Sequence, residues 1–139
     1  MHAKKILFPT DFSHASDAAL NYTASLARDM KATLVIVHVE EPLPAYVGEA
    51  YYGIPNPPNP EVRRMLEAVK PPADVPHEHR LLSGDPAEEI VRLAAEKHVD
   101  MIVMSTHGRT GLSRLLMGSV AEHVVRRAAC PVLTFKQPQ

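Results

Sequence analysis

Apolar positions along the chain follow two different periods, and these periods predict the secondary structure. Short runs in which nearly every residue is apolar or β-branched are typical of strands buried in a parallel sheet. Apolar residues that recur every three or four positions are typical of helices with one buried face. The runs predict strands over residues 4–8, 33–39, 77–82, 100–104 and 131–135. The helical spacing predicts helices over residues 15–30, 61–69, 85–95 and 119–128.

Residues suited to capping precede three of these helices. Ser13 is expected to cap the first helix, since a side-chain oxygen there can accept from the first backbone N–H groups. Asp85 is followed by proline and, three residues on, by glutamate, which is typical of a helix start. Ser119 with Glu122 has the spacing of a capping box, which predicts that Ser119 caps the last helix.

Strands and helices alternate along the chain, and this order predicts the fold class. Such alternation indicates right-handed crossovers and a parallel sheet covered by helices on both faces. We expect an α/β fold with an open five-stranded parallel sheet, order 3-2-1-4-5, in a single domain over residues 1–139. Residues 42–60 interrupt the pattern with six prolines and two glycines, so regular structure is not expected there.

The fold class also predicts where a ligand would bind. Open α/β sheets bind ligands at the carboxyl ends of the strands, where the direction of winding reverses. In the order 3-2-1-4-5 that point lies between strands 1 and 4. The loops that follow these strands, residues 9–13 and 105–108, are the most unusual in the sequence. Small residues before the last helix add backbone N–H groups and a helix dipole, which together favour a phosphate.

Composition narrows the function classes. The net charge is −1 and the pI is about 6.7, so bulk attraction to nucleic acid or to anionic lipid is not expected. Cys130 is the only cysteine, which excludes an internal disulfide and fits a reducing compartment. No apolar run approaches the roughly 20 residues of a membrane-spanning helix. The expected location is therefore the cytoplasm.

Four motifs together give the chain a resemblance to a known family. They are Ile6-Leu7-Phe8-Pro9-Thr10-Asp11-Phe12-Ser13, then His38-Val39, then Gly84-Asp85-Pro86, and finally the spaced set Ser105, Gly108, Gly118 and Ser119. In this pattern the chain resembles the universal stress protein family, on its ATP-binding branch. The resemblance covers nearly the whole chain and is weakest over residues 42–80.

The resemblance implies a bound ATP, with or without Mg²⁺, and a role for each matching residue. Asp11 and Val39 would contact the adenosine, with Pro9 and Thr10 shaping that wall, and Met104 and Ser105 would approach the ribose and adenine. Gly108, Arg109, Gly118, Ser119 and Val120 would hold the phosphates, and His107 would order their loop. No catalytic residue and no protein metal site is expected.

Ser105 departs from the family pattern, which has glycine as the first residue of the spaced set. If the position needs a positive φ, serine there costs roughly 1–2 kcal/mol. If the position needs only a small side chain, serine fits and adds a hydroxyl.

Three functions remain open at the level of sequence. The first is an ATP-binding regulatory protein, and the second is a dimeric interaction module that does not retain nucleotide. The third is a slow ATP hydrolase, which the absence of a Gly-x4-Gly-Lys-(Ser/Thr) motif makes less favourable. A homodimer is expected through residues 131–136, an apolar edge strand in the assumed order.

Other residues have both an ordinary and a functional interpretation. His77 and His79 place two imidazoles on one side of a strand, as a solvated edge or as a metal pair. His38 is expected to be a hydrogen-bonded core histidine, and Cys130 a small buried apolar residue. The tyrosines of residues 42–60 belong either to a disordered connector or to a lid over the cleft.

Overall fold

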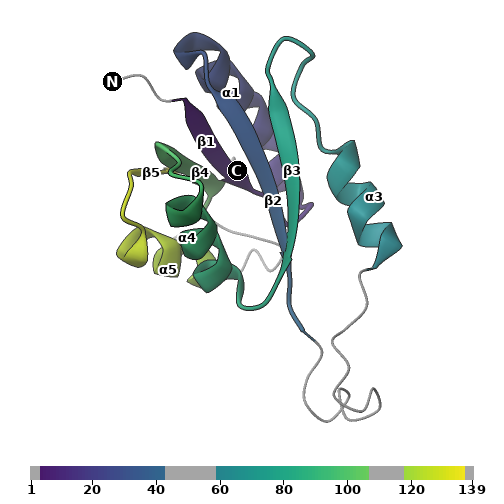
Figure 1. The fold of residues 1–139 in the computed structure, drawn as a ribbon, viewed down its shortest axis with the longest axis vertical. Coiled ribbons are helices and arrows are strands. Elements are labelled where there is room, and N and C mark those ends of the chain that lie inside the picture. Colours follow the sequence, from purple (N-terminus) through teal and green to yellow (C-terminus); the bar gives the residue numbers. More distant parts are fainter. Residues whose placement is uncertain (1–3, 43–58, 107–117, 137–139) are drawn as a thin grey trace.

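The computed structural model describes residues 4–42, 59–106 and 118–136, and Figure 1 shows how their elements are arranged. The strands are β1 (Lys5–Pro9), β2 (Thr33–Glu40), β3 (His77–Ser83), β4 (Met101–Ser105) and β5 (Val132–Phe135). The helices are α1 (His14–Met30), α3 (Pro60–Ala68), α4 (Pro86–Glu96) and α5 (Ser119–Arg127). In the described part of the chain, no helix is long and apolar enough to cross a membrane.

The strands form one sheet in the order β3-β2-β1-β4-β5, and every neighbouring pair is parallel. This arrangement confirms the expected fold class and strand order. β1 is the central strand, where Ile6 lies beside Leu34 of β2 on one side and Met101 of β4 on the other. The carboxyl ends of β1, β2 and β4 consequently lie at the same edge of the sheet.

Two apolar cores cover the two faces of the sheet. Leu7 of β1 packs into the core that contains residues of α4 and α5. Ile6 and Phe8 point to the opposite face, into the core that contains residues of α1 and α3. Because successive side chains of a strand alternate between faces, one short strand contributes to both cores. Because β1 packs against both cores, the loop that follows it starts from a fixed position.

The helix starts confirm two of the three predicted caps. The Ser13 hydroxyl accepts from the backbone N–H of Ser16 at 3.2 Å, and the Asp85 carboxylate accepts from that of Glu88 at 3.0 Å. The prediction that Ser119 caps α5 is wrong. The N-cap is Gly118, which has extended backbone (φ −63°, ψ 155°) and no side chain to form a cap bond.

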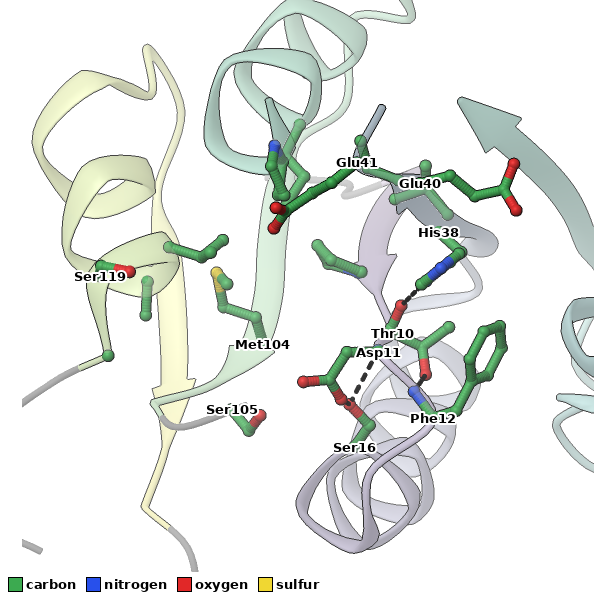
Figure 2. A pocket seen from close by; sticks show the side chains of 18 of the residues that line it. Thr10, Asp11, Phe12, Ser16, His38, Glu40, Glu41, Met104, Ser105 and Ser119 are labelled. Atoms are coloured by element: carbon green, nitrogen blue, oxygen red, sulfur yellow. Dashed lines mark hydrogen bonds between the residues drawn. The ribbon is translucent and has the colours of Figure 1, made fainter. Parts of the chain in front are cut away.

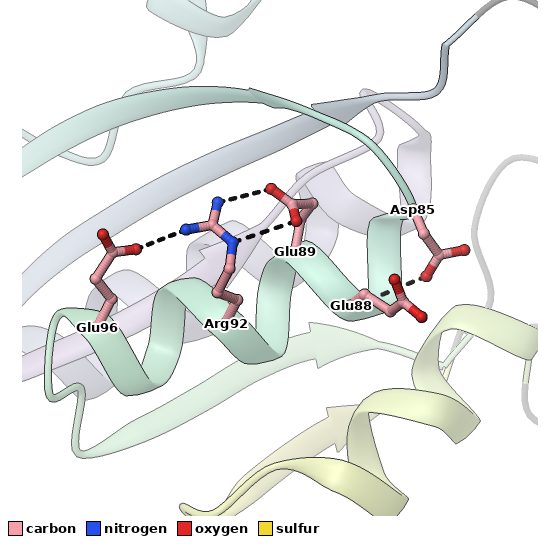
Figure 3. A network of polar contacts seen from close by, with 5 residues as sticks. All are labelled: Asp85, Glu88, Glu89, Arg92 and Glu96. Atoms are coloured by element: carbon pink, nitrogen blue, oxygen red, sulfur yellow. Dashed lines mark hydrogen bonds and ion pairs between the residues drawn. The ribbon is translucent and has the colours of Figure 1, made fainter.

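The outer face of α4 carries exposed ion pairs, as Figure 3 shows. Arg92 lies 2.7 Å from Glu89 and 2.8 Å from Glu96, at spacings of three and four residues. The hydrogen bond from Arg92 lowers the pKa of the Glu89 carboxyl. Solvent screens such pairs on a helix surface, so they support the helix only weakly and do not form a site.

Candidate functional site

A cavity of about 570 Å³ lies at the carboxyl ends of the central strands, beside the first turn of α5. Figure 2 shows the residues that surround it. Its lining includes the following residues predicted from sequence: Pro9, Thr10, Asp11, Val39, Met104, Ser105, Gly118, Ser119 and Val120. His107, Gly108 and Arg109 lie outside the described residues. The two loops singled out in the sequence therefore meet, as far as the structure describes them.

The loop after β1 forms a tightly bonded turn. One oxygen of the Asp11 carboxylate accepts from the Ser13 backbone N–H and from the Ser16 hydroxyl, each at 3.0 Å. The Thr10 hydroxyl accepts from the backbone N–H of Phe12 at 3.1 Å. Phe12 itself has a φ of 66°, which costs of order 1–3 kcal/mol for a residue with a side chain. These bonds hold the turn, and Figure 2 shows the other Asp11 oxygen pointing toward the side of Met104 and Ser105.

His38 of the neighbouring strand β2 contacts this turn through a hydrogen bond and a ring contact. Its Nδ1 lies 2.7 Å from the Thr10 carbonyl oxygen, and because a carbonyl only accepts, Nδ1 is the donor. Its ring also lies 4.4 Å from the ring of Phe12, centroid to centroid. The expected hydrogen bond is confirmed, but His38 is half-buried and lines the cavity rather than lying in the core. Sequence reasoning did not place it in the site.

The amino end of α5 forms the opposite wall. The Gly118 N–H donates to the Thr106 carbonyl at 2.7 Å, and the first bond of the helix runs from the Glu122 N–H to the Gly118 carbonyl. The N–H groups of Ser119 and Val120 therefore precede the first intrahelical bond. With the positive end of the helix dipole, they make this wall attractive to an anion.

Ser105 fits its position without backbone strain. Among the described residues, positive φ values occur at Phe12, Lys31, His98 and Gly84. Ser105 instead ends β4 and pairs with Phe135 of β5 as ordinary extended chain. The position therefore does not need the backbone conformation of glycine, and Figure 2 shows Ser105 facing Asp11 across the cavity.

Several lining residues were not predicted. Glu40 and Glu41 follow Val39 at the end of β2, and the rule that carboxyl ends of parallel strands meet could have found them. Side chains of α3 and α4 complete the wall without any motif to mark them, namely Val62, Met65, Pro86 and Ile90.

The charged groups of the described lining are all carboxylates. Asp11, Glu40 and Glu41 line the cavity, and no lysine or arginine does so within residues 4–42, 59–106 and 118–136. Figure 2 shows the carboxylates of Glu40 and Glu41 pointing in opposite directions from the strand end. In the same part of the chain no three His, Cys, Asp or Glu side chains gather as a metal site. Among the described lining residues, the groups that favour an anion at this end are the backbone amides at the start of α5.

Comparison with known proteins identifies relatives over nearly the full chain. The model of the universal stress protein family matches residues 2–136. The chain is 39% identical to universal stress protein MJ0531 of Methanocaldococcus jannaschii, covering 98% of this chain and 84% of that protein. It is 38% identical to universal stress protein A homolog 1 of Coxiella burnetii, covering 96% of each.

Solved structures share the fold. The structure of protein MJ0577 from Methanocaldococcus jannaschii has a TM-score of 0.82 at 31% identity, covering 100% of this chain and 99% of that one. A universal stress protein in complex with cAMP has a TM-score of 0.68 at 24% identity, covering 99% and 100%. One from Archaeoglobus fulgidus in complex with dAMP has a TM-score of 0.64 at 22% identity, covering 96% and 98%. From the match along its length and the shared fold, this chain belongs to the universal stress protein family.

Proposed function

We propose that this protein is a regulatory protein that binds ATP in the cavity between the loops after β1 and β4. The single observation that carries the proposal is the meeting of the Asp11 turn and the α5 amino end around one cavity of about 570 Å³. This volume lies in the usual range for small-molecule sites, about 300–1,000 Å³. Solved family members that hold cAMP and dAMP support an adenine nucleotide as the ligand class.

The two walls differ in chemistry, and the difference orients the nucleotide. A carboxylate repels phosphate but accepts hydrogen bonds from ribose hydroxyls, so Asp11 is assigned to the ribose. Val39 and Met104 provide apolar surface for the base. Gly118, Ser119 and Val120 are assigned to the phosphates, since their backbone lies at the positive end of α5. Mg²⁺, where it accompanies ATP, is then held by phosphates and water, as Mg²⁺ prefers.

Isothermal titration of the full chain with ATP and Mg²⁺ tests the proposal. Wild type is expected to bind one ATP per chain, and Gly118→Glu is expected to abolish binding because it adds bulk and negative charge at the phosphates. Ala129→Glu adds the same charge at an exposed position outside the cavity lining and serves as the matched control. Gly118→Ala separates bulk from charge, since the φ of −63° at Gly118 suits any residue.

Three results would contradict the proposal. If wild type shows no heat and copurifies with no nucleotide, the protein is an interaction module that does not retain ATP. Should Gly118→Glu bind as wild type does, the phosphates lie elsewhere. Turnover of ATP above roughly 1 per second, the low end of usual enzymes, would instead indicate a hydrolase, with Asp11 and His107 as the first residues to replace.

We also propose that two copies of the chain pair through β5. β5 is an edge strand of the sheet, paired only with β4 within the described chain. Leu133 is 40% exposed, and Tyr22, 63% exposed, stacks on Phe135 with ring centroids 5.1 Å apart. An apolar edge of this kind tends to be covered by a partner strand. A second copy is the proposed partner because an edge strand can pair with the same strand of another chain about a two-fold axis.

A further inference from the structure

His77 and His79 lie on β3, at the edge of the sheet opposite to β5. They pair with Leu34 and Ile36 of β2, whose side chains belong to the core on the α1 and α3 face. Both imidazoles therefore project to the face that carries α3. Their ring centroids lie 5.1 Å apart at an angle of 78° between planes. Neither ring belongs to the lining of the nucleotide cavity.

A backbone carbonyl fixes the state of the second ring. The Nε2 atom of His79 lies 2.7 Å from the carbonyl oxygen of Val69, the residue that ends α3. Because the carbonyl can only accept, Nε2 carries the hydrogen, and the lone pair of the neutral ring is on Nδ1. A metal-ligating histidine almost always donates its other N–H to a carbonyl or carboxylate in this way. His79 is thus held in the tautomer whose Nδ1 lone pair can bind a metal.

The separation of the rings agrees with coordination of one ion. With a Zn–N distance of about 2.0–2.1 Å and tetrahedral angles, two imidazole centroids on one ion lie about 5 Å apart. The observed 5.1 Å is close to this value, so the two rings lie near enough to share one ion. His77 is exposed, so its ring can turn a nitrogen toward an ion that enters from solvent.

We propose that His77 and His79 form a two-histidine site for Zn²⁺, with water in the remaining positions. The intervening Glu78 points to the other face and pairs with Lys97, so it is not a ligand. The described residues hold no group of three ligating side chains, which makes this an open surface site rather than a closed structural one. The bond from His79 to the Val69 carbonyl already joins β3 to the end of α3, and Zn²⁺ would bind at this junction.

Titration of the full chain with zinc chloride tests the site. The protein is prepared without a histidine tag. Nucleotides and chelating buffers are left out because both bind zinc. Wild type is expected to bind one Zn²⁺ per chain, with affinity at least tenfold lower in His77→Ala and in His79→Ala. His123→Ala removes an exposed histidine of α5 and is expected to bind as wild type does.

A ring-nitrogen NMR spectrum gives a second measurement. Zn²⁺ is expected to shift the Nδ1 signal of His79 and to leave its Nε2 protonated. Circular dichroism in EDTA checks folding, and His77→Gln keeps the test valid if His79→Ala unfolds, because His77 is exposed. The proposal is overturned if wild type binds no zinc, if His77→Ala and His77→Gln bind as tightly as wild type, or if His123→Ala loses as much affinity.

Discussion

Gly84 lies between β3 and α4 with a φ of 142°, a conformation that side chains rarely adopt. Its N–H donates to the Glu40 carbonyl at 2.9 Å, and an added Cβ would lie 3.1 Å from Cγ of Glu89. We expect Gly84→Ala to lower the free energy of unfolding by about 1–3 kcal/mol, mainly through backbone strain. Urea denaturation without nucleotide measures the change.

Gly118→Ala is the matched control for this substitution. Gly118 has a φ of −63°, which alanine adopts without strain, so its free energy of unfolding should change by less than about 0.5 kcal/mol. Equal losses in the two variants would show that the conformation of Gly84 is not the cause.

Single residues of the cavity were predictable where a motif marked them. Asp11 and Ser105 follow apolar strands, and the ends of strands 1 and 4 were expected to meet. His38 was missed because its pattern is that of a buried strand, and only the structure shows Nδ1 on the Thr10 carbonyl. Met65 was missed because contacts of α3 depend on packing, which no local pattern encodes.

At the level of the helices, the assigned N-caps can be tested by alanine substitution. Replacing Ser13 or Asp85 with alanine should each lower the free energy of unfolding by about 1 kcal/mol, since each removes an observed cap bond. Ser119→Ala should leave stability nearly unchanged, because Ser119 does not cap α5. Thermal or urea unfolding without nucleotide compares the variants.

Two outcomes would contradict this assignment of caps. If Ser119→Ala lowers the free energy of unfolding as much as Asp85→Ala does, Ser119 caps α5 after all. A neutral Ser13→Ala would mean that the bond to the Ser16 N–H, 3.2 Å long, contributes little. In titrations with ATP, Ser119→Ala should still weaken binding, because the Ser119 hydroxyl can donate to the phosphates beside the backbone N–H groups assigned to them.

Elements were predicted to within one or two residues at their ends. The start of α5 illustrates why the ends are harder than the elements themselves. Ser119 with Glu122 fits a capping box in sequence, yet Glu122 pairs with Arg126 and the Gly118 carbonyl begins the helix. The residue at which a helix starts depends on how the preceding residues are bonded. Here the Gly118 N–H donates to the Thr106 carbonyl.

At the scale of the whole molecule, the proposed pairing of two chains can be broken at one residue. Leu133 aligns with Val103 and is exposed, whereas Val132 packs against the core that contains α4 and α5. We therefore expect Leu133→Lys to convert a dimer to a monomer without unfolding it. Light scattering measures the mass, and circular dichroism checks the fold.

Ala95→Lys places the same charge on an exposed position of α4 and should leave the mass unchanged. A wild-type chain that is monomeric, or a Leu133→Lys variant that stays dimeric, would reject β5 as the interface.

The topology was the most predictable feature of the molecule, and the reason is geometric. Strands that alternate with helices commonly pair in parallel through right-handed crossovers, as β1 and β2 do through α1. Alternation alone does not dictate the strand order, so the order 3-2-1-4-5 was a separate assumption that the structure confirms. Pairing of two chains through residues 131–136 was also expected from sequence and stays a proposal. The structure adds that Leu133 is an exposed large apolar side chain of β5.

Thr106 bonds to both the amino end of α5 and the end of β5. Its carbonyl accepts from the Gly118 N–H, while its own N–H and hydroxyl donate to the Phe135 carbonyl at 2.8 and 3.1 Å. The bonds of Thr106 therefore link the amino end of α5 to the last residue of β5. If ATP favours the proposed pairing of two chains, reciprocity requires that the paired chains bind ATP more tightly by the same factor.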